Sequence, residues 1–436
     1  MNQTKVKDFL NNYRMDFSDL DFERICDSFL EAMRRGLAGE PSDLQMLPTY
    51  IQTESEVPLN EPVLVLDAGG TNFRAATVSL GREGQVSIEN FAKYPMPGVK
   101  AEVDKDTLFE TMAHYIKDLI GNGQKIGFCF SYPVRMFPDR DGRLIAFSKQ
   151  IKARGVAGEL IGENLRLALG KTGANQPGSI VILNDTVATL LAGKAELEHR
   201  NSSGFIGFIL GTGTNCCYQE RNSNILKETN PLDASKSQII NIESGGFNGD
   251  FGGVLDYKYD LTTADPGKYT LEKMISGRYL GGLCQVVIKT AADDGLFSKA
   301  GSDGIKLLKE VSTIDLNSYL KNDQSRNNPL MAALTSGTDE DRAMLADLIE
   351  RLIERAGMLA AMTLTAAVLK SGQGLNPEAP VCITAEGTTF HQLKGLKAKT
   401  ESYLKQYLTD HYHRYWKLVE VDNATLIGAA VAGLTN

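Results

Sequence analysis

The chain has 436 residues, of which 42% are hydrophobic and 23% are charged, and its 54 acidic and 46 basic side chains give a net charge of -8. This composition excludes disordered, collagen-like and coiled-coil proteins, and the acidic balance argues against a nucleic-acid-binding surface. Two domains are expected, because a single hydrophobic core usually stops growing at about 250–300 residues.

The first segment, residues 1–40, carries apolar side chains at helical spacing. It predicts a helical stretch that ends where Gly36 and Pro41 interrupt the pattern. Residues 1–10 mix charged and polar side chains and lack the apolar region of a secretory signal, so we expect no such signal.

Strands and helices alternate in the next part of the chain. Residues 62–80 contain two β-rich runs joined at glycines, which predicts a hairpin. Short apolar strands are expected at 125–130 and 179–183, and helices at 107–120 and 159–169. This alternation is typical of an α/β layered domain.

A second unit of strand, glycine turn and strand covers residues 204–220, about 140 residues after the first. A weak internal repeat of this kind predicts two domains of one type that face each other. Residues 339–370 predict a long helix, which is apolar on all sides after Arg355 and is therefore expected to be buried. A strand at 379–387 and a helix at 425–433 complete the predicted elements.

The glycine turn of the first hairpin is a candidate phosphate site. Gly69 and Gly70 have no side chain, so their N–H groups can approach an anion closely. A strand follows the turn instead of a helix, and neither a P-loop nor a dinucleotide fingerprint is present. Thr71 and Asn72 would donate hydrogen bonds, and Asp67 would lie near a metal ion. Alone, this pattern is explained better as an ordinary hairpin turn.

The second glycine turn, residues 211–215, repeats the same chemistry with the sequence GTGTN. Two such turns at equivalent places are what a nucleotide held between two lobes requires.

A third candidate is Asp185, which follows Asn184 at the start of a helix expected over 187–199. It is either the cap of that helix or the base of a phosphoryl transfer.

Together these motifs resemble those of the hexokinase family. Its first phosphate motif is similar to LDAGGTNFR (66–74), its catalytic-aspartate motif to LNDT (183–186), and its second phosphate motif to GTGTNCCYQE (211–220). The resemblance runs from about Pro62 to Ala430. It implies an α/β protein with two actin-like (ribonuclease H-like) lobes and a nucleotide and sugar cleft between them.

The resemblance also implies where the lobes begin and end. The small lobe would span 60–187, with the C-terminal helix 425–436 packed back onto it. The large lobe would comprise 1–59 and 188–424. The implied ligands are ATP, Mg²⁺ and a hexose.

Three groups of site residues follow from the resemblance. The catalytic residues would be Asp185, as the base, and Lys149. The hexose would contact Ser131, Ser148, Lys149, Asn184, Asp185, Asn215, Glu243 and Glu272. The nucleotide would contact Asp67, Gly69, Gly70, Thr71, Asn72, Arg74, Gly211, Thr212, Gly213, Thr214, Gly387 and Thr388, with Mg²⁺ held near Asp67 through water. Without the resemblance, Glu243 and Glu272 would be interpreted as solvated surface charges.

The expected function is an ATP-dependent hexose kinase that transfers the γ-phosphoryl group to the 6-hydroxyl of glucose or a related hexose when the cleft closes. Two alternatives remain: a sugar sensor without useful turnover, and a kinase of the same fold acting on glycerol, acetate or an N-acylated amino sugar.

Six cysteines without a paired C-x-x-C spacing predict reduced thiols in a cytoplasmic protein. No nucleic acid, membrane or obligate protein partner is expected.

Overall fold

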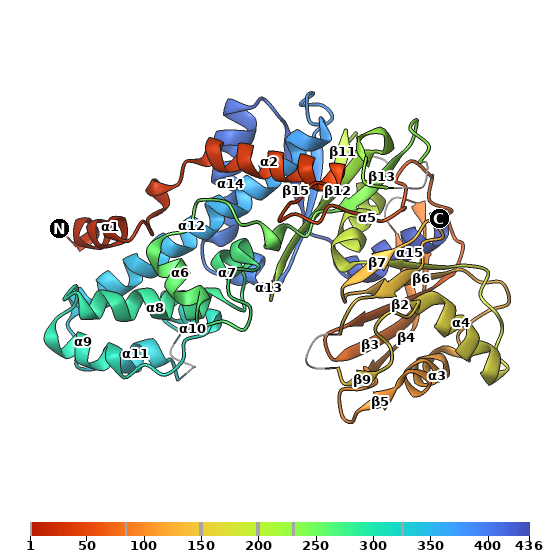
Figure 1. The fold of residues 1–436 in the computed structure, drawn as a ribbon, viewed down its shortest axis with the longest axis horizontal. Helices are drawn as coiled ribbons and strands as arrows, with labels where there is room; N and C mark the ends of the chain where they lie inside the picture. The colour runs from red at the N-terminus through yellow and green to blue at the C-terminus, as the bar shows by residue number, and fades with distance from the viewer. Residues whose placement is uncertain (1, 83–84, 148–150, 198–200, 229–231, 324–326) are drawn as a thin grey trace.

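The structure is a computed structural model, and it describes residues 2–82, 85–147, 151–197, 201–228, 232–323 and 327–436. Two mixed β-sheets dominate it, one built mainly from the first half of the chain and one mainly from the second (Figure 1). Two short ribbons accompany them: β5 (Val103–Asp104) with β9 (Ala153–Arg154), and β7 (Val134–Met136) with β8 (Gly142–Leu144).

The five-stranded sheet has the order β10-β6-β2-β3-β4. Its strands are β2 (Val63–Gly69), β3 (Asn72–Leu80), β4 (Val86–Pro95), β6 (Ile126–Phe130) and β10 (Ile180–Leu183). The first three pair antiparallel, whereas β6 and β10 extend the sheet in parallel from β2. The hairpin predicted over 62–80 is confirmed by the pairing of β2 with β3.

The six-stranded sheet has the order β1-β13-β12-β11-β14-β15. Its strands are β1 (Leu47–Pro48), β11 (Gly204–Leu210), β12 (Thr214–Arg221), β13 (Ser237–Asn241), β14 (Val381–Glu386) and β15 (Trp416–Val419). Here β11, β12 and β13 form the antiparallel part, and β14 and β15 extend it in parallel from β11. Apart from β1, both sheets therefore have the same topology, which confirms the predicted internal repeat.

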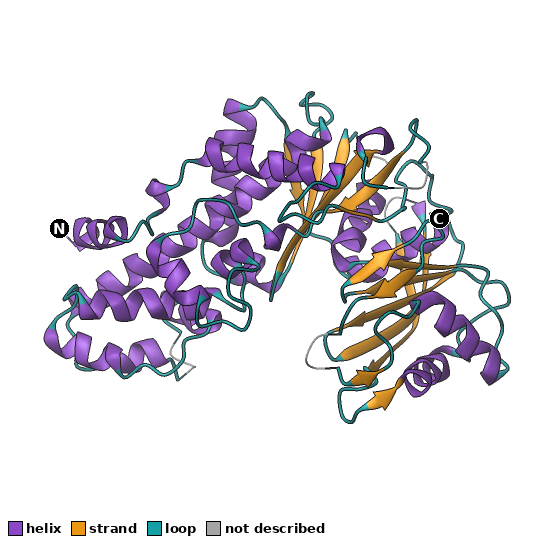
Figure 2. Ribbon diagram, in the orientation of Figure 1, coloured by secondary structure: helices purple, strands orange, loops and turns teal. Residues whose placement is uncertain are grey.

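Two helices lie between the sheets (Figure 2). They are α5 (Asp185–Leu197), which packs on β11 and β14, and α15 (Ala424–Thr435), which packs on β2 and β6. They also pack on each other so closely that a Cβ on Gly428 would come within 1.8 Å of the carbonyl oxygen of Ala188. The far face of the five-stranded sheet is covered by α3 (Lys105–Ile116) and α4 (Ile161–Thr172).

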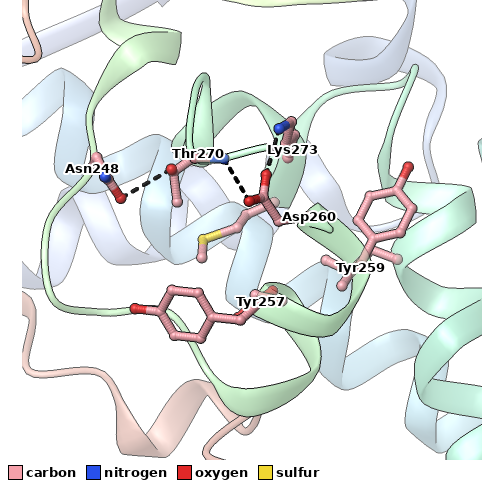
Figure 3. Close-up of a pocket in the computed structure, with 10 residues that line it drawn as sticks. Asn248, Tyr257, Tyr259, Asp260, Thr270 and Lys273 are labelled. Carbon is pink, nitrogen blue, oxygen red and sulfur yellow. Dashed lines mark hydrogen bonds and ion pairs between the residues drawn. The ribbon is translucent and has the colours of Figure 1, made fainter. Parts of the chain in front are cut away.

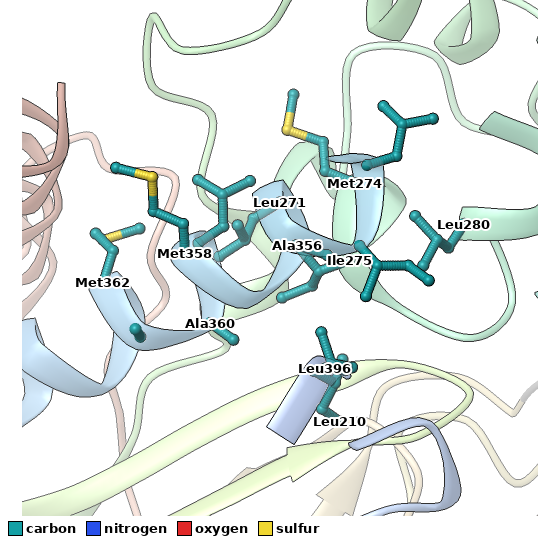
Figure 4. Close-up of a cluster of buried hydrophobic side chains, with 14 of the residues drawn as sticks. Leu210, Leu271, Met274, Ile275, Leu280, Ala356, Met358, Ala360, Met362 and Leu396 are labelled. Atoms are coloured by element: carbon teal, nitrogen blue, oxygen red, sulfur yellow. The ribbon is translucent and has the colours of Figure 1, made fainter. Parts of the chain in front are cut away.

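The other face of the six-stranded sheet is covered mainly by α12 (Asp339–Ser371), which packs on β11 and β12, and further helices of this half extend outward from it. They are α1 (Asn2–Asn12), α2 (Phe22–Ala38), α6 (Val254–Asp260), α7 (Thr270–Ile275), α8 (Leu280–Asp293), α9 (Lys299–Lys306), α10 (Thr313–Leu320), α11 (Pro329–Ala333), α13 (Thr388–Gln392) and α14 (Leu396–Tyr403). Side chains from α12, α7, α8, α14 and β11 meet in the core of this half (Figure 4).

The long helix predicted over 339–370 is confirmed, as is its burial after Arg355. Thr338 begins α12 with a capping box, and Gly372 ends it in the left-handed conformation. This helix is long and apolar enough to cross a membrane by length and composition alone. However, 89% of its most apolar window is buried inside the protein, as is usual for the core helix of a soluble protein.

Several predicted boundaries were wrong. Helix α2 does not end at Gly36 but runs on to Ala38. A Cβ at Gly36 would collide with the carbonyl oxygen of Leu44, so this glycine allows close packing and does not end the helix. Helix α3 ends at Ile116, short of the predicted residue 120. Strands β4 and β15 were not predicted, because most positions of β4 are exposed and all of β15 is half-buried, so neither alternates clearly.

Candidate active site

The first turn, Gly70 and Thr71, connects β2 to β3, since Gly69 pairs directly with Asn72. The carbonyl oxygens of the turn are occupied: Tyr132 Oη donates to that of Gly70 and Met96 N to that of Thr71, both at 2.9 Å. In the described part of the chain, no residue accepts a hydrogen bond from the N–H groups of this turn. Exposed, unpaired N–H groups beside glycines form a site that favours an anion.

The acid of the first motif, Asp67, lies two residues before Gly69 and is 6% exposed. Arg74, its neighbour across the hairpin, donates to Asp67 Oδ2 at 2.9 Å. Burial raises the pKa of Asp67, whereas Arg74 and the side chains of Thr425 on α15 and Cys129 on β6 act in the opposite direction.

The second turn, residues 211–213, connects β11 to β12 and is enclosed by neighbours. The carbonyl oxygen of Gly211 accepts from Gly277 N and Thr389 Oγ1, both at 2.8 Å, and that of Thr212 accepts from Arg278 N at 3.1 Å. Among the described residues, the N–H groups of Thr212 and Gly213 have no acceptor. The second turn therefore presents unpaired donors, as the first does.

Gly387 lies directly against the second turn. Its φ of 118° suits glycine alone, and a Cβ there would lie 2.4 Å from the backbone of Leu210. Its own Cα is 3.5 Å from the position that a Cβ on Gly211 would take. Thr388 begins α13 beside it. The structure thus brings Gly387 and Thr388, two predicted nucleotide contacts, together with the second phosphate turn.

Three predicted sugar ligands gather just beyond the second turn. Thr214 N donates to Glu272 Oε2 at 3.0 Å, and a Cβ on Gly213 would lie 2.6 Å from the same oxygen, so a side chain there would displace the carboxylate. Asn215 Nδ2 donates to Glu243 Oε1 at 3.1 Å. Both glutamates are half-buried rather than solvated, so the interpretation as surface charges was wrong.

Helix α7, which carries Glu272, is anchored from behind. The next residue, Lys273, is 3% exposed and forms an ion pair with Asp260. Asn248 accepts a hydrogen bond from Thr270 at 3.0 Å. These groups line a cavity of about 90 Å³ together with Tyr257, Tyr259, Met274 and other residues (Figure 3). The cavity is lined by none of the predicted site residues.

Asn184 and Asp185 stand where β10 ends and α5 begins. Both side chains accept from the same backbone donor, Thr186 N, at 2.9 Å to Asn184 Oδ1 and 2.8 Å to Asp185 Oδ1. Each therefore contributes to the cap of the helix. The other carboxylate oxygen of Asp185, Oδ2, does not accept this hydrogen bond.

The acids of the site act on one another electrostatically. Burial raises the pKa of Asp185, and the charge of Asp67 raises it further. Burial raises the pKa of Glu243 to about 7, and the charge of Asp185 is the next largest cause. Burial also raises the pKa of Glu272, although its bond from Thr214 opposes this. Asp185 is thus coupled both to the acid of the phosphate motif and to an acid of the sugar motif.

Ser131, which was predicted to contact the hexose, lies against the first phosphate motif. Its N–H donates to the carbonyl oxygen of Ala68 at 2.9 Å, and its Oγ would be 3.3 Å from a Cβ on Gly69. Ser148 and Lys149, predicted to contact the hexose, lie outside the described residues.

A magnesium ion is compatible with this donor set. Among the described residues, no three Asp, Glu, His or Cys side chains converge as an all-protein metal cage requires. Mg²⁺ commonly binds one or two carboxylates and takes its remaining ligands from phosphates and water. The single carboxylate of Asp67 beside the first turn fits that mode.

Sequence reasoning missed three residues that contact this site. Cys129 and Thr425 lower the pKa of Asp67, and Asn241 donates to Glu243 Oε1 at 2.7 Å. Only Asn241 carried a readable signal, as a polar residue at the end of an apolar strand and two positions before a glutamate. The other two are recognisable only from the packing of β6 and α15.

Two family models, both described as hexokinase, match the chain over residues 5–195 and 205–435. The chain belongs to the hexokinase family. Relatives in this family include Hexokinase-3 of Rattus norvegicus, 30% identical over 377 residues, which cover 83% of this chain and 40% of the relative. Hexokinase-1 of Schizosaccharomyces pombe is 28% identical over 428 residues, covering 94% of this chain and 86% of that protein. The chain thus spans about 40% of the length of the Hexokinase-3 relatives that it matches.

Solved hexokinase structures have the same fold. A hexokinase from Schistosoma mansoni complexed with glucose aligns over 100% of both chains, with a TM-score of 0.78 and 24% identity. A second hexokinase crystal structure aligns over 99% of this chain and 98% of its own, with a TM-score of 0.77 and 20% identity. The predicted α/β, two-lobed, actin-like architecture is confirmed by this likeness.

Proposed function

We propose that this chain is an ATP-dependent hexose kinase, which transfers the γ-phosphoryl group of MgATP to the 6-hydroxyl of glucose or a related hexose. The coupling of Asp185 to both Asp67 and Glu243 carries the proposal. Asp67 precedes the first glycine turn, whose N–H groups are unpaired among the described residues, and Glu243 is hydrogen-bonded to Asn215 in the group of predicted sugar ligands. Membership of the hexokinase family supports the same reaction.

In the proposed reaction, Asp185 accepts the proton of the hexose hydroxyl as the phosphoryl group departs. Burial raises the pKa of Asp185, which makes it a stronger base than an exposed aspartate. The N–H groups of the two turns would hold the phosphates, and Asp67 would hold Mg²⁺ through water. The metal, when bound, neutralises charge on the phosphate oxygens.

The hexose is held by acceptors and amides in this proposal. Glu243 and Glu272 accept hydrogen bonds from ring hydroxyls, and Ser131, Asn184 and Asn215 complete the contacts, together with Ser148 and Lys149. Buried acceptors of this kind reject ligands without matching hydroxyls, because their own hydrogen bonds would be lost. That argues for a polyhydroxylated ring over glycerol or acetate.

The lobes of the proposal are residues 60–187 with 425–436, and residues 1–59 with 188–424. Packing of α15 on β2 and β6, and pairing of β1 with β13, support this division. Closure of the lobes on the sugar would exclude water, which otherwise competes as an acceptor of the phosphoryl group. All six cysteines are free thiols, which supports a cytoplasmic location.

The test is an ADP-release assay with glucose, fructose, mannose, N-acetylglucosamine and glycerol. We expect turnover with hexoses and little with glycerol. Asp185→Asn should lower kcat by about 10²–10⁴-fold, the usual contribution of a general base, while glucose binding by calorimetry stays within about tenfold. Asp118→Asn, an exposed acid of the same lobe, is the control and should leave kcat unchanged.

Other outcomes would point to the alternatives. Glucose binding by the parent without turnover of any acceptor would indicate a sugar sensor. Turnover of glycerol or N-acetylglucosamine in preference to glucose would indicate a kinase with another substrate. Full activity of Asp185→Asn would remove Asp185 from the reaction.

A further inference from the structure

Asn241 is a buried amide at the end of β13 with a place in the candidate sugar site. It is 5% exposed and pairs with Cys217 across the sheet. Both ends of its side chain are bonded to predicted sugar ligands: Nδ2 to Glu243 and Oδ1 to Asn215. Asn241 is not among the predicted catalytic, sugar-binding or nucleotide-binding residues.

The direction of these hydrogen bonds is set by the backbone. The N–H groups of Cys216 and Ser244, which can only donate, point at Asn215 Oδ1 at 2.8 and 3.3 Å. Asn215 Nδ2 must therefore donate to the other two partners, Asn241 Oδ1 at 2.8 Å and Glu243 Oε1 at 3.1 Å. Asn241 Nδ2 is then left to donate to Glu243 Oε1 at 2.7 Å.

The hydrogen-bonding capacity of Asn215 is filled by these four bonds. A hexose can be reached by Asn215 only if one of them opens, and the bond to Glu243 is the longer of its two side-chain bonds. Asn241 can keep its bonds to both residues when that happens. It therefore holds the pair together in either arrangement.

Glu243 depends on such support. Its backbone lies in the left-handed region, with φ 58° and ψ 48°, which is unfavourable for a residue with a side chain. Both hydrogen bonds to its carboxylate end on Oε1, and no other described residue bonds to Oε2. Oε2 is consequently the oxygen that a ligand hydroxyl can reach.

The charge of Glu243 is balanced by the same contacts. Burial raises its pKa to about 7, the nearby carboxylates of Asp185 and Glu272 add to the rise, and the amides of Asn241 and Asn215 oppose it. The carboxylate therefore becomes protonated as pH falls through about 7. Loss of the Asn241 donor would raise this pKa further, so that protonation would begin at higher pH.

We propose that Asn241 is a positioning residue of the hexose site, which turns Oε2 of Glu243 toward the sugar and fixes the side chain of Asn215 without itself contacting the ligand. The inference rests on the proposed hexose-kinase function. It predicts an effect on sugar affinity and on its pH dependence, but not on the transfer step.

The experiment compares Asn241→Asp and Asn241→Ser with the parent protein. The aspartate keeps the size of the side chain but replaces the Nδ2 donor by an oxygen, and the serine shortens the side chain. Each should raise the KM for glucose about tenfold or more, the effect of losing a hydrogen bond to a charged group, while kcat changes less than about threefold. The acid limb of kcat/KM for glucose should move to higher pH by about one unit. Calorimetry with glucose alone should show the same shift.

Gln238→Leu is the matched control. Gln238 is a buried amide on the same strand, 2% exposed, but it bonds to Tyr50 and Asn222 instead of the sugar ligands. This variant should keep the acid limb of the parent protein.

Three results would overturn the proposal. The first is an unshifted acid limb with an unchanged glucose KM in both variants, and the second is an equal shift in Gln238→Leu. The third is loss of the folded circular dichroism spectrum in both variants, since that would make Asn241 a residue needed for folding. The proposed function fails separately, if the parent binds glucose but releases no ADP. The binding measurements would still decide the role of Asn241 in that case.

Discussion

The two halves of the molecule share one strand order but support their glycine turns differently. In the first half, two residues form the turn and both are exposed. In the second half, three residues form it, and segments around Gly277 and Gly387 enclose it. A repeated topology therefore places the same feature twice, and the surrounding packing decides whether its residues are exposed or enclosed by their neighbours.

The difference suggests a division of labour between the turns. The second turn is bonded to Glu272 through Thr214, so its geometry is connected to the candidate sugar site. The first turn is flanked by Asp67 and Arg74 on its two paired strands and is connected to the predicted phosphate and metal side. The two halves also bury acids differently: Asp141 accepts from the N–H groups of Gly142, Gly162 and Glu163, whereas Asp256 is bound by Arg355.

The largest effect should come from breaking the buried ion pair of the second half. Arg355 on α12 is 2% exposed and donates to Asp256 Oδ1 at 2.9 Å. Arg355→Ala should lower the free energy of unfolding by about 3–5 kcal/mol, because Asp256 would keep a buried charge without a partner. Lys5→Ala removes an exposed ion pair between α1 and Glu340, which lies on α12 like Arg355. It should lower the free energy of unfolding by less than about 1 kcal/mol. Urea unfolding followed by circular dichroism measures both, and equal losses would contradict the prediction.

A smaller loss is expected where the last helices of the two halves meet. A Cβ on Gly428 would lie 1.8 Å from the backbone oxygen of Ala188, so Gly428→Ala must push α15 away from α5. We expect a loss of about 1–3 kcal/mol in thermal or urea unfolding. In Gly170→Ala the new methyl group near the end of α4 meets only Gln176 Nε2, at an ordinary contact distance of 3.6 Å, and the helix should gain up to about 1 kcal/mol. If both substitutions act alike, the close contact between the halves has no energetic consequence.

The mildest effect should distinguish the two turns directly. Gly213→Ala would displace the Glu272 carboxylate and should raise the KM for glucose about tenfold, through loss of a charged hydrogen bond. Gly70→Ala meets no neighbour but must adopt a φ of 58°, at a cost of about 1–2 kcal/mol in that turn. It should raise the KM for MgATP and leave the KM for glucose nearly unchanged. Steady-state kinetics with each substrate varied would measure both KM values. If the two variants changed them in the same way, the two turns would not have different roles.

Local patterns in the sequence were sufficient for the repeated framework. Apolar runs and glycines predicted both hairpins, and the two turns appear where the motifs of residues 69–72 and 211–214 predicted them. Helix boundaries were less certain, because Gly36 reads as a helix breaker in the sequence but serves as a contact point in the structure. Strand β4 escaped because a mostly exposed edge strand has no alternating pattern.

The sequence by itself determined the family, the two-part α/β fold and the residue types available for catalysis, since these depend on short motifs and their order. Only the tertiary structure decided that Glu243 is half-buried, that Asn241 orients it, and that Thr425, near the far end of the chain, lowers the pKa of Asp67. The physical reason is that the charge and direction of a side chain depend on solvent exclusion and on hydrogen-bond partners, which residues distant in the sequence supply once the chain has folded.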